Sequence, residues 1–228
     1  MIIVEPYAKL LSIDGHEPTA ASGIKALRKI EWCGRVSHAS EEAQTEDSWQ
    51  RFIKAVVFEH GDWSIVEHVS ATVDMLVDRG ITHEFVRHRL FSFTQSSTRF
   101  INYAKKMPPS FIMPDFGSHE SDWTQQAEFE WKLAIGQCEE VYRKLLGNGV
   151  APQIARSVFP NALSSRIIVT GNLRNWRHFL IMRTTKEAHP QMRQVTIPLL
   201  AEFKEKLPIL FDDLEPNAKQ SESMKRMR

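Results

Sequence analysis

The sequence predicts a fold of the α+β or mixed α/β class, in which helices and strands are combined without regular alternation. Three observations lead to this prediction. Apolar residues recur at helical spacing over residues 45–61 and 121–146, and they alternate with polar residues over 69–77. The chain has 228 residues, of which 42% are hydrophobic and 25% are charged. This composition is typical of a globular protein that needs no disulfide or structural metal to fold.

The predicted elements follow these patterns in chain order. Acidic residues at 46–47 open the first helix, as the helix dipole prefers, and Gly61 marks its end. The period of two over 69–77 predicts a half-buried strand. The long helix at 121–146 stops at Gly147. The remaining predicted elements are a helical turn over 82–86, a strand over 167–170, a helix over 173–182, and a helix over 197–207 with Pro198 in its first turn.

Charge and cysteine content exclude several classes of protein. Lys and Arg together number 29 and Asp and Glu 28, for a formal net charge of +1. This balance argues against binding to a nucleic-acid polymer or a membrane surface, so an anion site must be local. Cys33 and Cys138 match no metal or redox spacing, and we expect both to be reduced and buried. No apolar run reaches the ~18 residues that a membrane span requires, so we expect a cytoplasmic protein.

The chain shows no internal repeat. We therefore expect a single catalytic domain over residues 1–216. The last residues, 217–228, contain lysines and serines but no large apolar anchor, and we expect them to form a flexible tail.

The densest polar cluster covers residues 87–100. Three arginines, a histidine and a run of hydroxyl and amide side chains supply many hydrogen-bond donors. A guanidinium fork suits a phosphate group or the paired edge of a uracil ring. A basic surface loop is the alternative interpretation, and the residues alone leave it open.

Two further clusters lie at 155–160 and 172–183. On the predicted helix of the second cluster, Arg174 and His178 are four residues apart and share one polar face. Arg183 instead falls on the apolar side, where a guanidinium group needs an acid or a ligand anion. A salt bridge at the helix end is the alternative for Arg183.

Several familiar site chemistries do not fit the residues. His83 and His88 are five residues apart, so a helix would turn the second ring about 140° from the first, and we expect no metal site. Ser97 lies in no Gly-x-Ser-x-Gly turn and has no oriented base, so we expect it to hydrogen-bond a ligand and not to act as a nucleophile. The chain has neither a dinucleotide-binding Gly-x-Gly-x-x-Gly motif nor a phosphate-binding loop.

Arg87-His88-Arg89, followed after seven residues by Ser97 and then by Arg99, resembles the signature of flavin-dependent thymidylate synthases. The resemblance extends over about residues 27–207. It implies a mainly antiparallel sheet flanked by helices, and a homotetramer whose four active sites lie at subunit interfaces. Each site would hold FAD and dUMP, with NADPH as reductant and methylenetetrahydrofolate as one-carbon donor to carbon 5 of uracil. The cofactors would carry the chemistry, and no side chain would attack the base.

The resemblance also implies roles for individual residues. The positions that match flavin contacts are Ser64, Arg87, His88, Arg89, Gln95, Asn172, Arg174 and His178. The positions that match nucleotide contacts are Glu84, Arg87, Gln95, Ser97, Thr98, Arg99, Arg156 and Arg183. Arg183 matches the catalytic residue that polarises or ionises the ring imide. The residues that depart from the pattern are Asp62, Gln95, Phe100 and His178.

Two alternatives stay open at this level. A relative that hydroxymethylates the pyrimidine nucleotide would have the same binding demands and would differ in whether the added carbon is reduced. A nucleic-acid-binding module would instead use the arginine-rich loop for salt-dependent binding to polymers, although the near-zero net charge argues against it.

Overall fold

The computed structural model describes residues 1–103, 105, 107–116, 125–219 and 222. Its strands are β1 (Ile2–Ile3), β2 (Tyr7–Ile13), β3 (Ser70–Asp78), β4 (Ser92–Gln95), β5 (Ser110–Phe111) and β6 (Ser164–Asn172). Its α-helices are α1 (Ala20–Val36), α2 (Ser48–Phe52), α3 (Arg79–Phe85), α4 (Gln125–Gly147), α5 (Pro152–Ala155), α6 (Leu173–Arg183) and α7 (Pro190–Lys206). Shorter helical segments are η1 (Glu41–Ala43), η2 (Ile53–Glu59), η3 (Trp63–His68) and η4 (Arg156–Val158). The predicted mixed class is confirmed.

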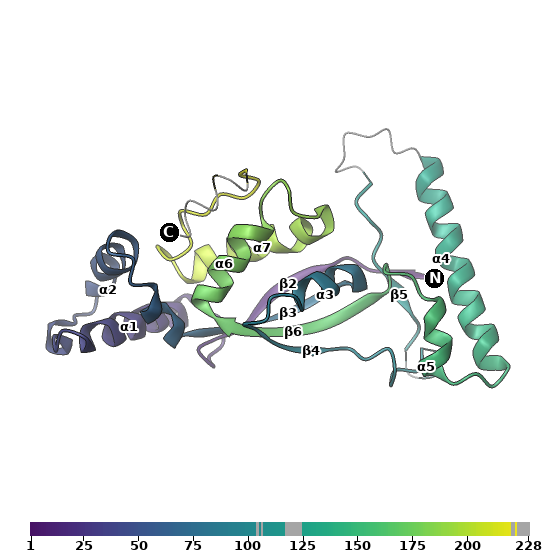
Figure 1. Cartoon of the computed structure of the whole chain (residues 1–228), viewed down its shortest axis with the longest axis horizontal. Helices are drawn as coiled ribbons and strands as arrows, with labels where there is room; N and C mark the ends of the chain where they lie inside the picture. The colour runs from purple at the N-terminus through teal and green to yellow at the C-terminus, as the bar shows by residue number, and fades with distance from the viewer. Residues whose placement is uncertain (104, 106, 117–124, 220–221, 223–228) are drawn as a thin grey trace. The chain divides into compact units, whose positions relative to one another are not determined.

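Four strands form an antiparallel sheet in the order β2-β3-β6-β4 (Figure 1). A separate parallel pair joins β1 to β5, with Ile2 opposite Ser110. Along β3 the residues alternate between half-buried and buried positions, from Ser70 to Val77. The strand predicted at 69–77 is therefore confirmed, and the one predicted at 167–170 is the middle of the longer strand β6.

The residues divide into two compact units. Unit 1 comprises Met1–Tyr7, Met75–Arg87 and Thr94–Ile167, and unit 2 comprises Ala8–Asp74, His88–Phe93 and Ile168–Arg228. The expectation of one catalytic domain over residues 1–216 stays a prediction.

The core of unit 1 is built from aromatic and aliphatic side chains of α4 and the segments around it. Tyr142 of α4 packs against Phe159, with ring centroids 4.4 Å apart, and its hydroxyl accepts a hydrogen bond from the backbone nitrogen of Tyr103. The buried members of this cluster are Tyr103, Phe111, Ile135, Tyr142, Ala155 and Leu163.

The core of unit 2 centres on α6 and α7, which lie side by side (Figure 1). Trp176 is fully buried, lies 5.6 Å from Phe203 between ring centroids, and donates its indole hydrogen to the carbonyl of Ala71. On the same helix, buried Arg177 forms two hydrogen bonds to the carboxylate of Asp213, at 2.7 and 2.6 Å. These contacts fix α6, which carries several of the predicted site residues.

The predicted start of the last helix is wrong. Helix α7 begins at Pro190 and not at 197, and Pro198 lies inside it. Pro190 occupies the first turn, where its missing N–H is not needed, and the His189 side chain caps the helix by accepting from the nitrogen of Gln191. The buried face that includes Met192 and Leu199 holds the helix together across the proline.

The apolar positions at helical spacing in 121–146 do not all lie on the buried face of α4. Ile135, Glu139 and Tyr142 are buried, whereas Val141 is 42% exposed. Glu139 is charged, so the pattern of apolar residues does not mark its position as buried. Its carboxylate is tolerated there because it pairs with the Arg143 guanidinium at 2.8 Å and with the Met1 amino group at 3.1 Å. Trp123, which was expected on the same helix, lies outside the described residues.

The two cysteines and the end of the chain differ in part from what the sequence predicts. Cys33 and Cys138 are unpaired thiols, but both are half-buried and not buried. In the predicted flexible tail, the backbone nitrogen of Asn217 donates to the carbonyl of Thr184 at 2.7 Å. The first residue of the tail is therefore held against the rest of the chain by a hydrogen bond. Most of the rest, 220–221 and 223–228, lies outside the described residues. No helix among the described residues is long and apolar enough to cross a membrane.

Candidate functional site

In unit 2, residues 88–93 are anchored by an aromatic side chain. The ring of Phe91 packs edge-on against Trp176 at 4.8 Å and also contacts Phe179. This packing requires a glycine at position 171, because a Cβ atom there would lie 2.4 Å from the Phe91 ring. The anchor at Phe91 holds the polar residues on its N-terminal side, including His88, against α6.

His88 and Arg183, which were both predicted as site residues, meet in unit 2. The Nε of Arg183 donates to the Nε2 of His88 at 3.1 Å, and the imidazole packs edge-on against Phe179 at 4.9 Å. Burial, followed by the charges of Arg183 and His178, lowers the pKa of His88 from 6.5 to about 4. The imidazole is therefore neutral at physiological pH.

The start of α6 carries three more predicted residues. Asn172 caps the helix by accepting from the nitrogen of Asn175 at 2.8 Å. Arg174 forms an exposed ion pair with Glu67 at 2.5 Å. Burial and then the charge of Arg174 lower the pKa of His178, so His178 is also neutral at physiological pH. The predicted sharing of one face by Arg174 and His178 agrees with this coupling.

In unit 1, a second set of predicted residues converges around Gln153. Arg156 donates from Nη1 to the hydroxyl of buried Thr98 at 2.6 Å and from Nε to the carbonyl of Gln153 at 3.2 Å. Arg99 donates from Nε to the side-chain oxygen of Gln153 at 3.2 Å, and its backbone nitrogen donates to the hydroxyl of Ser97. Two guanidinium groups held by shared neutral partners form a site suited to a phosphate.

Gln95 departs from the family pattern, and its hydrogen bonds explain why an amide side chain suits this position. Its Nε2 donates to the hydroxyls of Thr82 at 2.9 Å and Ser165 at 3.0 Å. The Thr82 hydroxyl already donates its own proton to the carbonyl of Arg79, so it needs a donor as its next partner. A glutamate would not supply that donor.

Arg87, Arg89 and Glu84 are the remaining predicted residues of the Arg87 segment. Arg87 and Arg89 are exposed, and Glu84 is half-buried near the end of α3. Arg87 belongs to unit 1 and Arg89 to unit 2. Phe100, another departure, is 73% exposed, with the Arg99 guanidinium 5.4 Å from its ring centroid.

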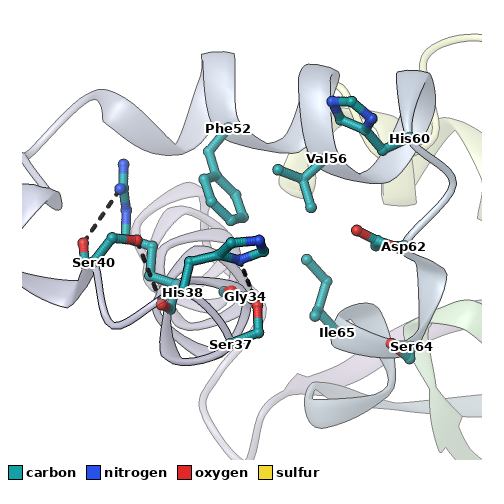
Figure 2. Close-up of a pocket in the computed structure, with 11 residues that line it drawn as sticks. Gly34, Ser37, His38, Ser40, Phe52, Val56, His60, Asp62, Ser64 and Ile65 are labelled. Atoms are coloured by element: carbon teal, nitrogen blue, oxygen red, sulfur yellow. Dashed lines mark hydrogen bonds between the residues drawn. The ribbon is translucent and has the colours of Figure 1, made fainter.

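A pocket of about 780 Å³ lies in unit 2 beside Ser64 (Figure 2). Figure 2 shows Phe52 and Val56 above the pocket, Ser37 and Ile65 below it, and His38 and Asp62 on its two sides. The lining residues are Gly34, Arg35, Ser37, His38, Ser40, Phe52, Val56, His60, Asp62, Ser64 and Ile65. Three apolar and seven polar or charged side chains thus line the pocket, so a small planar ligand could be held there by both packing and hydrogen bonds.

The pocket owes its shape to an unusual helix. Of the helix predicted at 45–61, residues 48–59 are helical, and the second part of these, η2, is a π-helix. Gly61 ends it with a φ of +85°, which a residue with a side chain rarely adopts. π-Helical segments are rare and often lie at functional sites. Neither the π-helix nor the pocket residues Ser37, His38 and Phe52 were predicted as site features; they lie within the range of the family resemblance, 27–207, which assigned them no role.

The comparisons with known proteins agree with one another. The profile of the family described as thymidylate synthase complementing protein matches residues 22–209. A flavin-dependent thymidylate synthase from Corynebacterium aurimucosum is 33% identical over 88% of this chain and 84% of its own length. One from Corynebacterium diphtheriae is 35% identical over 89% of this chain and 84% of its own.

A solved structure shares the fold. The UMP/dUMP methylase from Streptomyces cacaoi, crystallised with 5-Br dUMP, matches with a TM-score of 0.75 over 93% of this chain and 96% of its own, at 23% identity. The family profile and the sequence relatives show that the chain belongs to the flavin-dependent thymidylate synthase family.

Proposed function

We propose that this chain converts dUMP to dTMP by reductive methylation, with FAD as cofactor and with NADPH and methylenetetrahydrofolate as co-substrates. Family membership supports the reaction. The observation that carries the assignment to residues is the guanidinium of Arg183 held by a neutral imidazole. When bound, the flavin would supply the hydride that completes the methyl group, and the protein would bind, orient and stabilise charge.

Arg183 is the residue proposed to act on the uracil ring. A guanidinium group stays protonated at all physiological pH values and offers a planar fork of donors. Placed at the ring imide, it would stabilise negative charge there and make carbon 5 a better nucleophile. The Nε of Arg183 donates to the Nε2 of His88 at 3.1 Å, which restrains the guanidinium group.

The nucleotide phosphate is assigned to Arg99 and Arg156, which share Gln153 as a partner. The hydroxyls of Ser97 and Thr98 belong to the same cluster. Ser97 accepts a hydrogen bond from the nitrogen of Arg99, which supports a ligand-binding role and gives it no general base. Glu84, Arg87 and Gln95 remain assigned to the nucleotide through the family pattern.

The flavin is assigned to Ser64, to Arg87–Arg89 with Gln95, and to the Asn172, Arg174 and His178 positions of α6. The donor set fits this cofactor. Exposed arginines suit a diphosphate, and neutral donors such as His178 suit the polar edge of an isoalloxazine ring without adding charge. Arg174 would have to exchange its exposed ion pair with Glu67, which costs little.

We assign the part of this pocket next to Asp62 to the ring of a co-substrate, which would lie beside the flavin contacted by Ser64. Its volume of about 780 Å³ and the apolar side chains of Phe52, Val56 and Ile65 suit a flat heterocycle. The carboxylate of Asp62 at its edge would accept hydrogen bonds from the amino and imide N–H groups of a reduced pterin. A nicotinamide ring carries an amide but no such paired donors, so the pocket fits methylenetetrahydrofolate better.

The tetramer with shared sites is also a proposal. Large apolar side chains are exposed on the single chain, among them Phe129 (60%) and Leu133 (54%) of α4 and Leu90 (75%). Co-expression of Arg156→Ala and Arg183→Ala chains with different tags would give mixed tetramers. If each site takes these two residues from different chains, the mixed tetramers regain activity that neither parent has. If both come from one chain, activity stays absent.

The visible absorption spectrum tests the cofactor assignment. The purified protein should show flavin bands that bleach when NADPH is added without oxygen and recover when oxygen returns. Protein that remains colourless after incubation with FAD would contradict the proposal. The cytoplasmic location stays a prediction.

A further inference from the structure

Arg177 of α6 is a buried cation to which the proposed chemistry gives no role. Only 3% of the residue is exposed to solvent. Its Nη1 donates to the carbonyl of Leu210 at 2.8 Å, and its two Nη nitrogens form a paired fork to the carboxylate of Asp213. Such a fork fixes the plane of a guanidinium group. The orientation of Arg177 is therefore set by the segment that follows α7.

The guanidinium group of Arg177 also lies over two aromatic rings. Its central carbon is 5.2 Å from the ring centroid of Phe58 and 4.8 Å from that of Trp63. The two rings contact each other edge-on at 5.2 Å. A guanidinium group is attracted to the face of an aromatic ring, more strongly where water is excluded. Arg177 thus links α6 to both rings.

These two rings lie on either side of a turn that forms part of the pocket in Figure 2. Phe58 lies near the end of the π-helix η2, and Trp63 begins η3. The residues between them include His60 and Asp62, which both line the pocket. The backbone nitrogen of Asp62 donates to a backbone carbonyl of η2 at 3.0 Å, which ties the turn to the π-helix. The contacts of Arg177 tie the same turn to α6.

A second contact between α6 and η3 is weaker. Arg174 pairs with Glu67, and both side chains are nearly half exposed. Exposed ion pairs contribute little to stability. Arg174 is also assigned to the flavin, so binding of the cofactor would break this pair. The buried contacts of Arg177 would remain and would keep η3 against α6 when the cofactor is bound.

We propose that Arg177 is a positioning residue for the co-substrate pocket: by holding Phe58 and Trp63, it fixes the turn that carries Asp62 relative to the positions of α6 assigned to the flavin. This inference rests on the proposed assignment of the pocket. Transfer between two bound molecules needs a constant separation, and a shift of about 1 Å can cost roughly 100-fold in rate. Arg177 lies outside the pocket lining, so it would act through the two rings.

Two variants remove the two halves of this contact. Arg177→Met keeps most of the side-chain volume but loses the charge and the fork, and Phe58→Leu keeps an apolar side chain but loses the ring. We expect each to lower kcat/KM for methylenetetrahydrofolate roughly 10-fold, with the KM for dUMP and the flavin content unchanged. Lys204→Met is the matched control, because Lys204 also donates to the segment after α7, at the carbonyl of Asp212. It should leave all three quantities unchanged.

A simpler role for Arg177 makes a different prediction. If Arg177 only anchors the segment after α7, Asp213→Asn will lower kcat/KM as much as Arg177→Met does, and Phe58→Leu will behave as the wild type. That pattern would overturn the inference. Positioning through the rings predicts that Asp213→Asn, which keeps an acceptor and both ring contacts, changes kcat/KM less than about 3-fold. Loss of flavin from both Arg177→Met and Phe58→Leu would also overturn the inference.

A double-mutant cycle with Asp62 separates this inference from the proposed function. Asp62→Ala alone should lower kcat/KM for methylenetetrahydrofolate, and if it does not, the assignment of the pocket fails. If it does, Arg177→Met should cause no further loss in the Asp62→Ala background, because its effect acts through the turn. A further loss of roughly 10-fold there would overturn the positioning role alone.

Amide hydrogen exchange tests the inference without measuring activity. In Arg177→Met, residues 58–63 should exchange faster than in the wild type, because the turn has lost its contact with α6. Phe58→Leu leaves the ion pair of Arg177 and Asp213 intact and should have the same effect on these residues. If Arg177→Met speeds exchange in residues 207–214 but not in 58–63, Arg177 anchors the segment after α7 and the inference is wrong.

Discussion

Two arginine-bearing regions of the molecule hold their guanidinium groups in different ways. In unit 1, Arg99 and Arg156 are held by the hydroxyl of Thr98 and by Gln153, and Arg99 is exposed to water. In unit 2, Arg183 is half-buried and meets the ring of His88, which is itself packed on Phe179. The first region offers one exposed and one half-buried charge, and the second offers one half-buried charge oriented by its hydrogen bond to His88.

This difference matches two kinds of ligand group. A phosphate already carries its charge, so several solvated arginines suffice to bind it. A uracil imide is uncharged in the free nucleotide, and charge develops there only as the reaction proceeds. A single oriented guanidinium in partly desolvated surroundings stabilises such developing charge more strongly than a solvated one. The first region should therefore govern binding and the second turnover.

The largest expected effect is on turnover, from Arg183→Lys. An ammonium group cannot reproduce the planar fork or the hydrogen bond from Nε to His88. Turnover should fall roughly 100-fold or more, about 3 kcal/mol. The flavin content should persist, and Arg28→Lys on the exposed face of α1 is the control. Near-normal turnover, or loss of flavin, would show that the role of Arg183 is misassigned.

The next effect is on nucleotide binding, from Arg156→Ala. Loss of a charge-assisted hydrogen bond of about 2 kcal/mol should raise the KM for dUMP roughly 30-fold and leave kcat within about 3-fold. Steady-state kinetics over a range of dUMP concentrations measures both. Lys144→Ala, which removes an exposed ion pair to Glu140 in the same unit, should change neither constant. A fall in kcat without a change in the KM for dUMP would contradict the proposal that the Arg99–Arg156 region governs binding and the Arg183 region governs turnover.

A smaller effect should come from the pocket, through Asp62→Asn. The amide keeps one acceptor but loses the charge, so the KM for methylenetetrahydrofolate should rise roughly 10-fold, about 1.4 kcal/mol, with the KM for dUMP unchanged. Asp47→Asn, outside the pocket lining, is the control. If only the KM for NADPH rises, the pocket takes the nicotinamide and the assignment to folate is wrong.

The smallest expected effect is on stability at acid pH. The pKa of His88 is about 4 in the folded protein and near 6.5 in the unfolded chain, so the unfolded state binds more protons between these values. The free energy of unfolding should therefore decrease as the pH falls from 6.5 to 4. Between pH 7 and pH 4.5 the His88 contribution should be about 1 kcal/mol, after allowance for solvent screening.

Urea unfolding of the wild type and of His88→Gln at both pH values measures this difference. His178 faces His88, and burial lowers its pKa too, so His178→Gln serves as a parallel reference. An identical pH dependence in the wild type and His88→Gln would mean that His88 is not buried as a neutral ring.

Much of the fold follows from local patterns in the sequence. The alternation along β3 and the stripe of α6 predict both elements, because in each case one face is buried and the other is polar. The errors occur where long-range contacts override the local pattern. Glu139 is buried on α4 because Arg143 and the Met1 amino group neutralise it, and no local rule foresees the second partner.

The sequence predicts the residue types of the candidate site better than it predicts their contacts or the pocket. The signature around Arg87 and the arginines at 156 and 183 identify the family and the residue types that the chemistry needs. The partner of Arg183 was not predictable, because His88 is 95 residues away in the sequence. The pocket was missed because it depends on a π-helix, whose register the pattern of apolar residues in 45–61 does not distinguish from that of an α-helix.

The most direct test of the central claim is mass analysis of the product. The protein is incubated with FAD, NADPH, methylenetetrahydrofolate and dUMP without oxygen, and the nucleotide is then analysed. We expect dUMP to gain a methyl group, and we expect Arg183→Lys to yield little product while it still binds flavin. A nucleotide that carries a hydroxymethyl group, or unchanged dUMP from a protein that has bound its flavin, would contradict it.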